Sequence, residues 1–261
     1  MTLLPMNNDL KNLEISYAHF NAERALSAAS ESRFYLTNIG GLTLLIDENR
    51  PRDNRILGLC DRELENLPLA MREYSSFGIK PRIDLEPEAL TVKTTQILRK
   101  LGYHPSQSLI FLAMETNDGA GNSSSQVTVE VISHNRVDTF LEVLKKTTGL
   151  TCDDDLWQRR KHLYCTDKFV GFVAYFEGVP CACATLFIEG TKGILANAIT
   201  LEPYRGRGCQ QALLQTRINY ARLRDVQVLL TDVLPNSISL RNCQRAGFSP
   251  VNLRNLWEYV V

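Results

Sequence analysis

The chain has 261 residues, which is enough for one large domain or two of ordinary size. Hydrophobic residues make up 44% and charged residues 22% of the sequence, a composition that is typical of a globular protein with a substantial core. The 29 basic residues balance the 29 acidic ones, so the chain lacks the net positive charge that attracts nucleic acid or an anionic membrane.

The amino-terminal residues contain no basic segment followed by an apolar run, so no secretory signal is predicted. No stretch approaches the roughly 18 consecutive apolar residues that a bilayer-spanning helix needs. The seven cysteines include no pair with the spacing of a zinc or redox site, and Cys181 and Cys183 are interpreted as small core residues on one face of a strand. We therefore expect a cytoplasmic protein with no metal site and with neither nucleic acid nor a membrane as a partner.

The first half of the chain alternates strand and helix patterns. Apolar runs bounded by turn residues predict strands, and longer amphipathic stretches predict helices. The predicted order is a strand at 55–59, a helix at 61–77, a strand at 82–85, a helix at 88–101 and a strand at 109–113.

Residues 117–126 form the clearest break in composition. They include no large apolar side chain, and their Gly and Ser residues leave the backbone free. We therefore predict a linker at 117–126 between one lobe at 1–116 and a second at 127–261.

The second half begins with further elements. An alternating strand at 127–132 precedes a helix at 136–146. The acidic run 153–155 precedes basic residues, a pattern that fits the first turn of a helix better than a metal site. The remaining predicted order is a hairpin of 169–176 and 181–188, a strand at 194–201, a helix at 209–224, a strand at 226–233, a helix at 237–246 and a strand at 256–260.

Two landmarks repeat in the two halves. Pro87 and Pro235, which each follow a strand, are 148 residues apart, and Gly102 and Gly247, which each end a helix before an aromatic residue, are 145 apart. The matching elements between them favour a duplicated α/β unit. Chance remains the alternative, because alternating strands and helices are common in α/β proteins.

The segment with the clearest chemical meaning is Arg205-Gly206-Arg207-Gly208-Cys209-Gln210, which follows an apolar strand and Pro203 and opens a helix. The first backbone N–H groups of a helix have no partner within it, so a phosphate binds well there. Glycines let the backbone approach an anion closely, and the two arginines add charge that phosphate oxygens accept. A plain turn with solvated arginines is the competing interpretation.

Other phosphate-binding motifs fit this loop less well. The chain has no Gly-x-x-x-x-Gly-Lys-Ser/Thr sequence, which excludes a P-loop nucleotide site. A dinucleotide-binding fingerprint needs a third glycine where Gln211 stands.

The loop and the helix after it resemble the acyl-CoA-binding motif of the GNAT superfamily of N-acyltransferases. The downstream segment 236–248, which starts at Asn236 and ends in Gly247-Phe248, is similar to the next helix of that superfamily. Both motifs occur in the right order within 127–261. The whole layout resembles two-lobed GNAT proteins whose amino-terminal lobe is a degenerate copy, so we expect an α/β fold of two lobes, each a mixed, mostly antiparallel sheet flanked by helices.

The resemblance implies that acetyl-CoA is the cosubstrate and that an amine of a small molecule attacks its thioester directly. It implies roles in cofactor binding for a strand end, the loop and one asparagine: Ile199, Thr200, Leu201, Arg205, Gly206, Arg207, Gly208, Cys209, Gln210 and Asn236. The strand end would bind the pantetheine arm, and the loop amides would bind the pyrophosphate. The resemblance also leaves open a homodimer.

Two positions depart from the family pattern. Gln210 stands where the motif usually has Gly or Ala, and Cys243 stands where a tyrosine commonly protonates the departing CoA thiolate. A thiol with a pKa near 8.5 can protonate a thiolate of similar pKa, so Cys243 is the candidate general acid. The strand at 194–201 has no glutamate to act as base, and Asn197 could at most orient a water. A non-catalytic CoA-binding sensor or interaction module is therefore the alternative function.

The amino-terminal copy lacks the Arg/Gly loop. The corresponding residues, Cys60-Asp61-Arg62-Glu63, include acids that repel phosphate, so we do not expect this lobe to bind CoA. Among the four scattered histidines, His134 lies just past the first strand of the second lobe, where an acceptor could approach.

Overall fold

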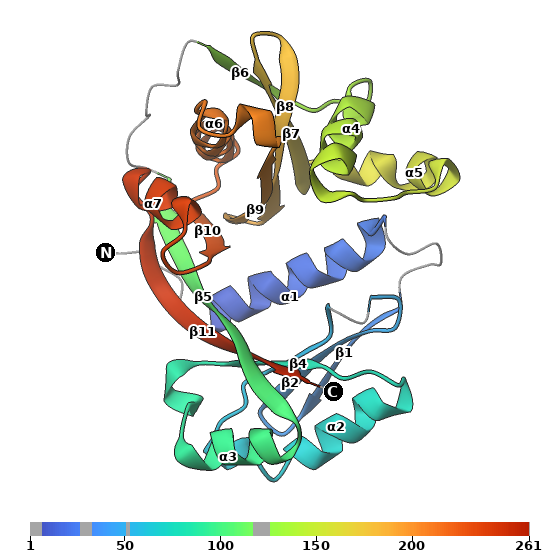
Figure 1. Cartoon of the computed structure of the whole chain (residues 1–261), viewed down its shortest axis with the longest axis vertical. Coiled ribbons are helices and arrows are strands. Elements are labelled where there is room, and N and C mark those ends of the chain that lie inside the picture. Colours follow the sequence, from blue (N-terminus) through green and yellow to red (C-terminus); the bar gives the residue numbers. More distant parts are fainter. Residues whose placement is uncertain (1–6, 27–32, 51–52, 117–125, 261) are drawn as a thin grey trace. The chain divides into compact units, whose positions relative to one another are not determined.

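A computed structural model describes residues 7–26, 33–50, 53–116 and 126–260. The chain forms two compact units (Figure 1). The large unit comprises Met1–Ala29 and Leu112–Val251, and the small unit comprises Ser30–Phe111 and Asn252–Val261. Contacts therefore divide the chain differently from a single cut at 117–126, since each unit takes a segment from the far end of the chain. Of the predicted linker only Gln126 lies within the described residues.

The small unit is a mixed sheet with two helices. Its strands follow the order β1-β2-β3-β4-β11-β5. The pairs β1/β2, β2/β3 and β4/β11 are antiparallel, whereas β3/β4 is parallel. The strands and helices are β1 (Phe34–Ile39), β2 (Leu42–Asp47), β3 (Arg55–Leu57), α2 (Leu67–Ser76), β4 (Arg82–Leu85), α3 (Val92–Lys100), β5 (Tyr103–Glu115) and β11 (Ser249–Tyr259).

Two predicted helices of this unit begin later than expected. The prediction at 61–77 is wrong for its first part: a short 3-10 turn, η2 (Asp61–Glu63), comes first, and α2 starts at Leu67. Pro68 explains the start, because proline lacks an N–H and is tolerated only in the first turn. In α3, the Thr91 side chain accepts a hydrogen bond from Thr94 N–H and so fixes the helix start after the 3-10 turn η3 (Pro87–Ala89).

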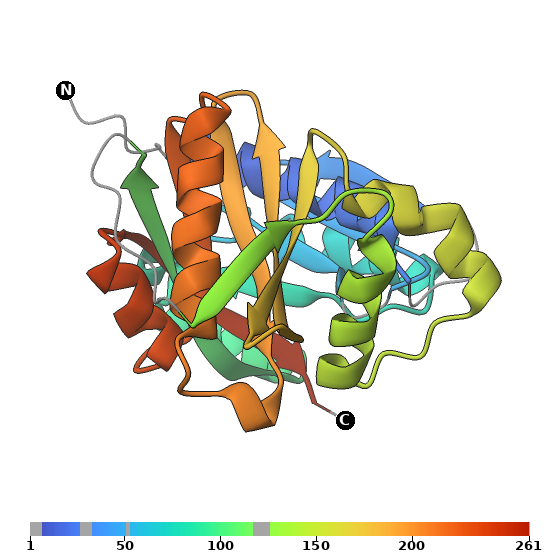
Figure 2. The ribbon, with the colours of Figure 1, turned by 90° about the horizontal axis from the view of Figure 1, so that it is seen from above.

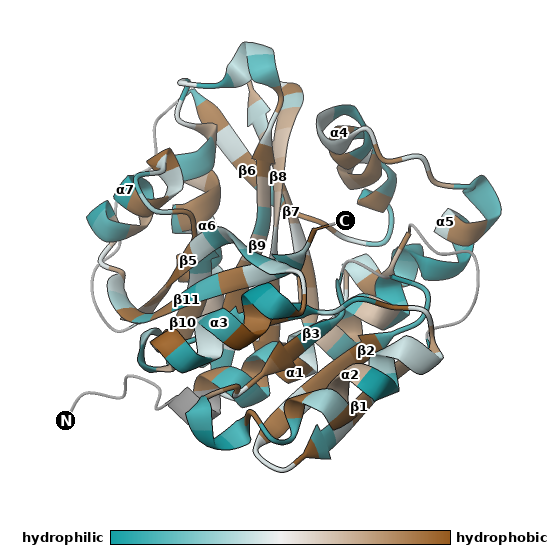
Figure 3. Cartoon of the chain, turned by 60° about the horizontal axis from the view of Figure 1, so that its bottom comes forward, coloured by the Kyte–Doolittle hydropathy of each residue, from teal (hydrophilic) through white to brown (hydrophobic). Residues whose placement is uncertain are grey.

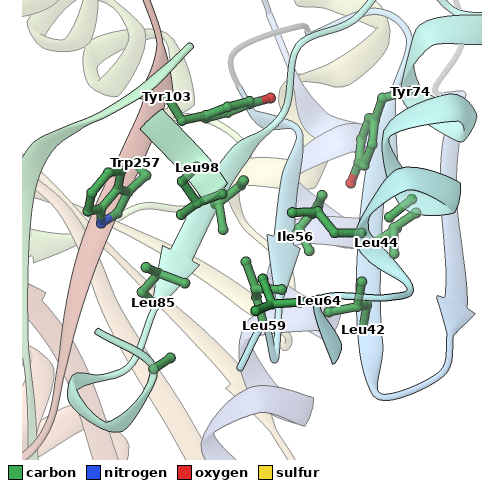
Figure 4. Close-up of a cluster of buried hydrophobic side chains, with 14 of the residues drawn as sticks. Leu42, Leu44, Ile56, Leu59, Leu64, Tyr74, Leu85, Leu98, Tyr103 and Trp257 are labelled. Carbon is green, nitrogen blue, oxygen red and sulfur yellow. The ribbon is translucent and has the colours of Figure 1, made fainter. Parts of the chain in front are cut away.

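The core of the small unit lies between its sheet and its helices. Tyr74 of α2 is fully buried, and its hydroxyl lies 3.0 Å from the carbonyl oxygen of Leu45 and 2.8 Å from that of Arg55. Figure 4 shows the surrounding leucine, isoleucine, tyrosine and tryptophan side chains from β2, β3, β4, α2, α3, β5 and β11. This cluster gives the small unit an apolar core of its own.

The strands of the large unit follow the order β5-β10-β9-β8-β7-β6. The pairs β6/β7, β7/β8 and β8/β9 are antiparallel, and β9/β10 is parallel. Its own elements are α1 (Asn7–Arg24), β6 (Val127–Val131), α4 (Val137–Thr148), α5 (Asp154–Arg160), η4 (Lys161–Tyr164), β7 (Phe169–Phe176), β8 (Val179–Glu189), β9 (Lys192–Thr200), η5 (Glu202–Tyr204), α6 (Cys209–Leu223), β10 (Val228–Val233) and α7 (Ile238–Arg245).

Helices cover both faces of this sheet (Figure 2), and successive side chains of β7 point alternately to one face and the other. The ring centres of Phe169 and of Phe20 in α1 are 5.2 Å apart. A Cβ atom added to Gly171, on the same face, would contact the ring of Phe140 in α4. The next residue, Phe172, points to the opposite face, where the centre of its ring lies 5.6 Å from that of Tyr220 in α6. The strands are largely hydrophobic, whereas helices such as α2 carry both hydrophobic and hydrophilic residues (Figure 3).

Most predicted elements of the large unit are confirmed. The acidic run begins a helix as predicted, because the Asp153 side chain accepts hydrogen bonds from two N–H groups of α5. The hairpin of β7 and β8 and the helix α6 lie where expected. Helix α1 and the hairpin of β1 and β2 were not predicted.

The same order of elements occurs in both halves of the chain, as a duplicated α/β unit requires. In each, an antiparallel pair leads through a helix to a parallel strand, and then through a second helix to a final strand. The two series are β2-β3-α2-β4-α3-β5 and β8-β9-α6-β10-α7-β11. Within the described residues, no helix is long and apolar enough to cross a bilayer.

Candidate functional site

The candidate site begins where β9 and β10 stop pairing. Their parallel register covers only Lys192–Ile194 against Val228–Leu230, and the Thr231 hydroxyl then donates to the Leu195 carbonyl at 3.0 Å. Beyond this point β9 continues to Thr200 and β10 to Val233 without pairing to each other. The backbone edge of β9 that faces β10 is therefore available to a ligand.

A β-bulge lies in β9 beside this opening. The register between β8 and β9 shifts between Cys183 and Thr185, and Asn197 adopts a left-handed conformation with φ of 50°. The Asn197 side-chain amide lies 3.3 Å from the hydroxyl groups of both Thr185 and Tyr17. Arg217 of α6 donates to the carbonyl oxygens of Thr185 and Ala196 at 3.1 and 3.3 Å, so the bulge is held from inside the unit.

The loop after β9 leads directly into α6. Gly206 and Gly208 have φ of 77° and 84°, a conformation that glycine adopts without strain. The first helical hydrogen bond runs from Ala212 N–H to the Gly208 carbonyl. The N–H groups of the residues before Ala212 in α6 therefore have no acceptor within the helix, and the first turn contains no acid. This helix start attracts an anion.

A cavity of about 480 Å³ opens at this helix start. It is lined by Ala198, Ile199, Thr200, Tyr204, Arg205, Gly206, Gly208, Cys209, Gln210, Gln211, Ile238, Ser239 and Asn242. The structure thus brings together most of the predicted cofactor-binding residues, while Leu201, Arg207 and Asn236 are not among its lining. The guanidinium of Arg207 lies 4.8 Å from the centre of the Phe176 ring, and Asn236 precedes α7.

Helix α7 contributes residues that the sequence did not indicate. Ser239 and Asn242 are three residues apart and therefore share one face of α7, which borders the cavity. Their spacing was readable in the sequence, but nothing there shows which face of the helix meets β9.

Gln210 has a structural partner that accounts for its departure from the motif. Its side-chain amide donates to the Thr200 hydroxyl at 2.8 Å and so joins the end of β9 to the first turn of α6. Cys209 is 2% exposed, with its Sγ 3.5 Å from Cys181 Sγ. Burial raises the pKa of Cys181 and, to about 12, that of Cys183, so these two thiols are uncharged core groups at neutral pH.

A second cavity of about 530 Å³ shares Ala198, Ile199, Gln210, Ser239 and Asn242 with the first. Its other lining residues come from α1, β9, β10, α6 and α7: Tyr17, Asn21, Leu195, Ala196, Asn197, Leu214, Arg217, Thr231, Asp232, Val233 and Cys243. Burial raises the pKa of the Cys243 thiol, and the nearby Arg217 opposes this change. The thiol is therefore protonated at neutral pH.

Residues 137–248 match the model of the acetyltransferase (GNAT) family. We refer to this part of the chain as the GNAT domain, after the family model that it matches. Among curated proteins, none matches the chain.

Solved structures of GNAT proteins share the fold of the chain. A GCN5-related N-acetyltransferase from Kribbella flavida is similar over 95% of both chains, with a TM-score of 0.67 and 14% identity. A GCN5-related N-acetyltransferase from Sphaerobacter thermophilus is similar over 83% of this chain and 76% of the other chain, with a TM-score of 0.66 and 14% identity. A tandem GNAT protein from the clavulanic acid biosynthesis pathway covers 97% of both chains, with a TM-score of 0.58 and 12% identity.

The small unit differs from the GNAT domain at the place that corresponds to the loop. There the Asp61 carboxylate accepts hydrogen bonds from the hydroxyls of Thr91 and Thr94 at 2.6 and 2.7 Å, which lower its pKa. Glu63 accepts from the Gly41 N–H at 2.8 Å. These carboxylates would repel an anion. That this lobe binds no CoA remains a prediction.

His134 does not line either cavity of the GNAT domain. Its Nδ1 lies 3.2 Å from Cys165 Sγ. The idea that it approaches the acceptor gains no support from this position. No group of three or more His, Cys, Asp or Glu side chains among the described residues could hold a metal ion.

Proposed function

We propose that the GNAT domain transfers an acyl group, acetyl in the simplest case, from CoA to the amine of a small molecule. The observation that carries this proposal is the open amino terminus of α6. Unpaired N–H groups, two glycines with positive φ and Arg205 meet there at one cavity, and no acid competes for the position. The pyrophosphate of CoA is the anion that this arrangement fits within a GNAT domain.

The pantetheine arm would follow the free edge of β9. Ile199 and Thr200 pair with β8 on one side, and their opposite edge has no strand partner among the described residues. An extended amide chain can hydrogen-bond to such an edge. This path would lead the thioester from the first cavity to the second, since the two share residues of β9 and α7.

The chemistry then needs only proton transfers and positioning. The amine loses a proton to water, its nitrogen attacks the thioester carbon, and the C–S bond breaks to release the CoA thiolate. Cys243 would supply a proton to this thiolate, because its thiol lines the second cavity and burial keeps it protonated. A water held by Asn197 would take the proton from the amine.

The experiment is calorimetric titration with acetyl-CoA and CoA, followed by single-turnover thiol release with a panel of small amines. We expect sub-millimolar binding and release that depends on the amine. Absence of binding to either ligand at millimolar concentration would contradict the proposal.

A CoA-binding sensor is the second candidate function, and the lack of a carboxylate or histidine in β9 favours it. Binding without turnover for any amine would support the sensor over the transferase. Within the transferase, the Cys243→Ala variant should lower kcat by about 10- to 100-fold with little change in KM. An unchanged kcat would remove Cys243 from the mechanism.

A further inference from the structure

Arg217 is a buried cation whose hydrogen bonds all go to neutral groups. The side chain comes from the middle of α6 and is 3% exposed. Its Nε donates to the Leu213 carbonyl at 3.2 Å, and its Nη1 donates to the carbonyls of Thr185 and Ala196. A buried guanidinium without a carboxylate is costly to hold, because neutral carbonyls offset only part of its lost hydration.

The structural role of Arg217 leaves one of its groups unused. Nε and Nη1 hold the helix and the β9 bulge, whereas Nη2 makes no hydrogen bond to any described residue. Arg217 is one of the residues that line the second cavity. A charged side chain with one unused donor therefore lines the space in which the reaction would occur.

The charge of Arg217 persists at neutral pH. Burial lowers the pKa of Arg217 to about 10, and the nearby thiols of Cys243 and Cys183 raise it in part. No carboxylate is among the groups that shift the pKa of Arg217. The guanidinium is thus a protonated, desolvated group that an incoming anion would stabilise.

The phosphates of CoA are not suited to this position. Arg217 lies eight residues after Cys209, which places it roughly 12 Å along the helix from the loop that we assign to the pyrophosphate. The cavity around Arg217 is also lined by polar residues, including Tyr17, Asn21 and Asn197, by Leu195 and Leu214, and by one acidic residue, Asp232. This space is suited to a small ligand with one anionic end.

We propose that Arg217 binds a carboxylate group of one of the two reactants and thereby sets the substrate class, an inference that rests on the proposed acyl transfer. The carboxylate could belong to the acceptor, which would then be an amino acid or a similar amine. It could also belong to the acyl group, as in the thioester of a dicarboxylic acid. In both cases Arg217 is a specificity-determining residue that pairs with the carboxylate through Nη2.

The first test compares matched ligands with the wild-type chain. In the acceptor arm, amino acids are compared with their amides and with the corresponding decarboxylated amines, using acetyl-CoA. In the acyl arm, succinyl-CoA and malonyl-CoA are compared with acetyl-CoA and butyryl-CoA, using one neutral amine. We expect at least a tenfold higher kcat/KM for the carboxylate-bearing member in one arm, and that arm identifies the source.

The second test measures binding and does not depend on turnover. The CoA-loaded protein is heated with each amino acid or with succinate, and the shift in Tm is compared with that produced by the matching amide. Stabilisation by the carboxylates alone would support the inference even if no acyl transfer were found, and the absence of transfer would then contradict only the proposed function.

Variants connect the effect to the side chain. Arg217→Gln keeps a donor for the bulge carbonyls but removes the charge, so the preference for carboxylates should disappear. Arg224→Gln is the matched control, because Arg224 follows the same helix and pairs with exposed Asp167. If Arg217→Gln does not fold, the kcat/KM values and Tm shifts of the wild type with matched ligands decide whether a carboxylate is preferred. Equal kcat/KM in both arms together with equal Tm shifts for carboxylates and amides would overturn the inference.

Discussion

At the scale of single residues, the candidate site depends on backbone conformation more than on side chains. The first residues of α6 line the cavity, and Gly206 and Gly208 before them adopt positive φ. Any other residue in this conformation is strained by roughly 1 to 2 kcal/mol. The arginines and the neighbouring side chains then add charge and shape to an anion site that the backbone already provides.

Gly206→Ala tests this role of the backbone. We expect a loss of stability of about 1 kcal/mol and at least a several-fold higher Kd for CoA, because the strained loop shifts its N–H groups. Gly178→Ala is a matched control: Gly178 has φ of 79° in the β7–β8 turn, and an added Cβ there, as at Gly206, would meet no atom within 4 Å. The Tm of the two variants should fall by a similar amount in thermal melts. Calorimetry should find weaker CoA binding only for Gly206→Ala. Equal Kd for both variants would contradict the assignment of the loop.

The two arginines of the loop should contribute unequally. Arg205 lines the first cavity, whereas the guanidinium of Arg207 lies over the Phe176 ring. We expect Arg205→Gln to raise the Kd for CoA by about 3- to 10-fold and Arg207→Gln to raise it less. Titrations at two salt concentrations measure both effects, and a larger loss for Arg207→Gln would show that its ring contact is given up when CoA binds.

The sequence indicated the loop but not the whole site. Glycines, arginines and a helix start lie together in one short segment, so local patterns were sufficient to find Arg205 to Gln210. Tyr17 and Asn21 could not be found in this way, because no local pattern relates residue 17 to a bulge at residue 197. Arg217 looks like a surface residue of an amphipathic helix until the bulged strand is placed against it.

At the scale of elements, the divergence of β9 and β10 creates the site. Their pairing ends after three residues, and the bulge at Asn197 turns β9 away from a regular register. The Thr200–Gln210 hydrogen bond then fixes the strand end to the helix start. The sequence predicted both strands but could not predict where they separate, since pairing depends on packing against α6 and α1.

Some missed elements did have local signals. Leu10, Leu13, Tyr17 and Phe20 recur at helical spacing in α1, and Gly40-Gly41 separates the two strands of the first hairpin. The late start of α2 also had a signal in Pro68. These features were readable, unlike the contacts that build the cavities.

Tyr74 provides a test of how α2 is held to the small unit's sheet. Burial raises the pKa of this phenol well above its ordinary value of about 10. The folded state therefore favours the protonated form, and its contribution to stability is complete below pH 10 and is lost as the pH rises toward the folded pKa. Tyr74→Phe should lower the free energy of unfolding by about 1 to 3 kcal/mol at pH 7, because the carbonyls of Leu45 and Arg55 lose their donor.

The same variant should differ less from the wild type at pH 11 than at pH 7. In that range the unfolded wild-type chain releases the Tyr74 proton while the folded chain retains it, so only the wild type loses stability through this group. Urea unfolding at the two pH values measures the difference. A difference that grows with pH would contradict the direction of the pKa shift.

At the scale of the whole molecule, each unit contains a segment from the other end of the chain. Helix α1 belongs to the large unit, where Tyr17 and Phe20 lie 5.3 and 5.7 Å from Phe187. The carboxyl-terminal part of β11 belongs to the small unit, where it pairs with β4. The family motifs in 137–248 are continuous in sequence, but the unit that contains them is not.

A fragment of residues 127–261 should therefore fail to form the binding site, although it contains every residue of the loop. It lacks α1 and β5, and so exposes the apolar surface of β7 and β8 that Phe20 covers. We expect aggregation or a loss of cooperative unfolding by circular dichroism, with no measurable CoA binding. A monomeric fragment with the CoA affinity of the full chain would show that the loop and its strand are sufficient.

The most direct test of the acyl-CoA site at the start of α6 is calorimetric titration of CoA into the full chain and into the Gly206→Ala and Gly178→Ala variants. We expect sub-millimolar binding to the wild type and to Gly178→Ala, and clearly weaker binding to Gly206→Ala. Absence of binding to the wild type, or equal binding to all three proteins, would contradict the assignment of the α6 amino terminus as the acyl-CoA site.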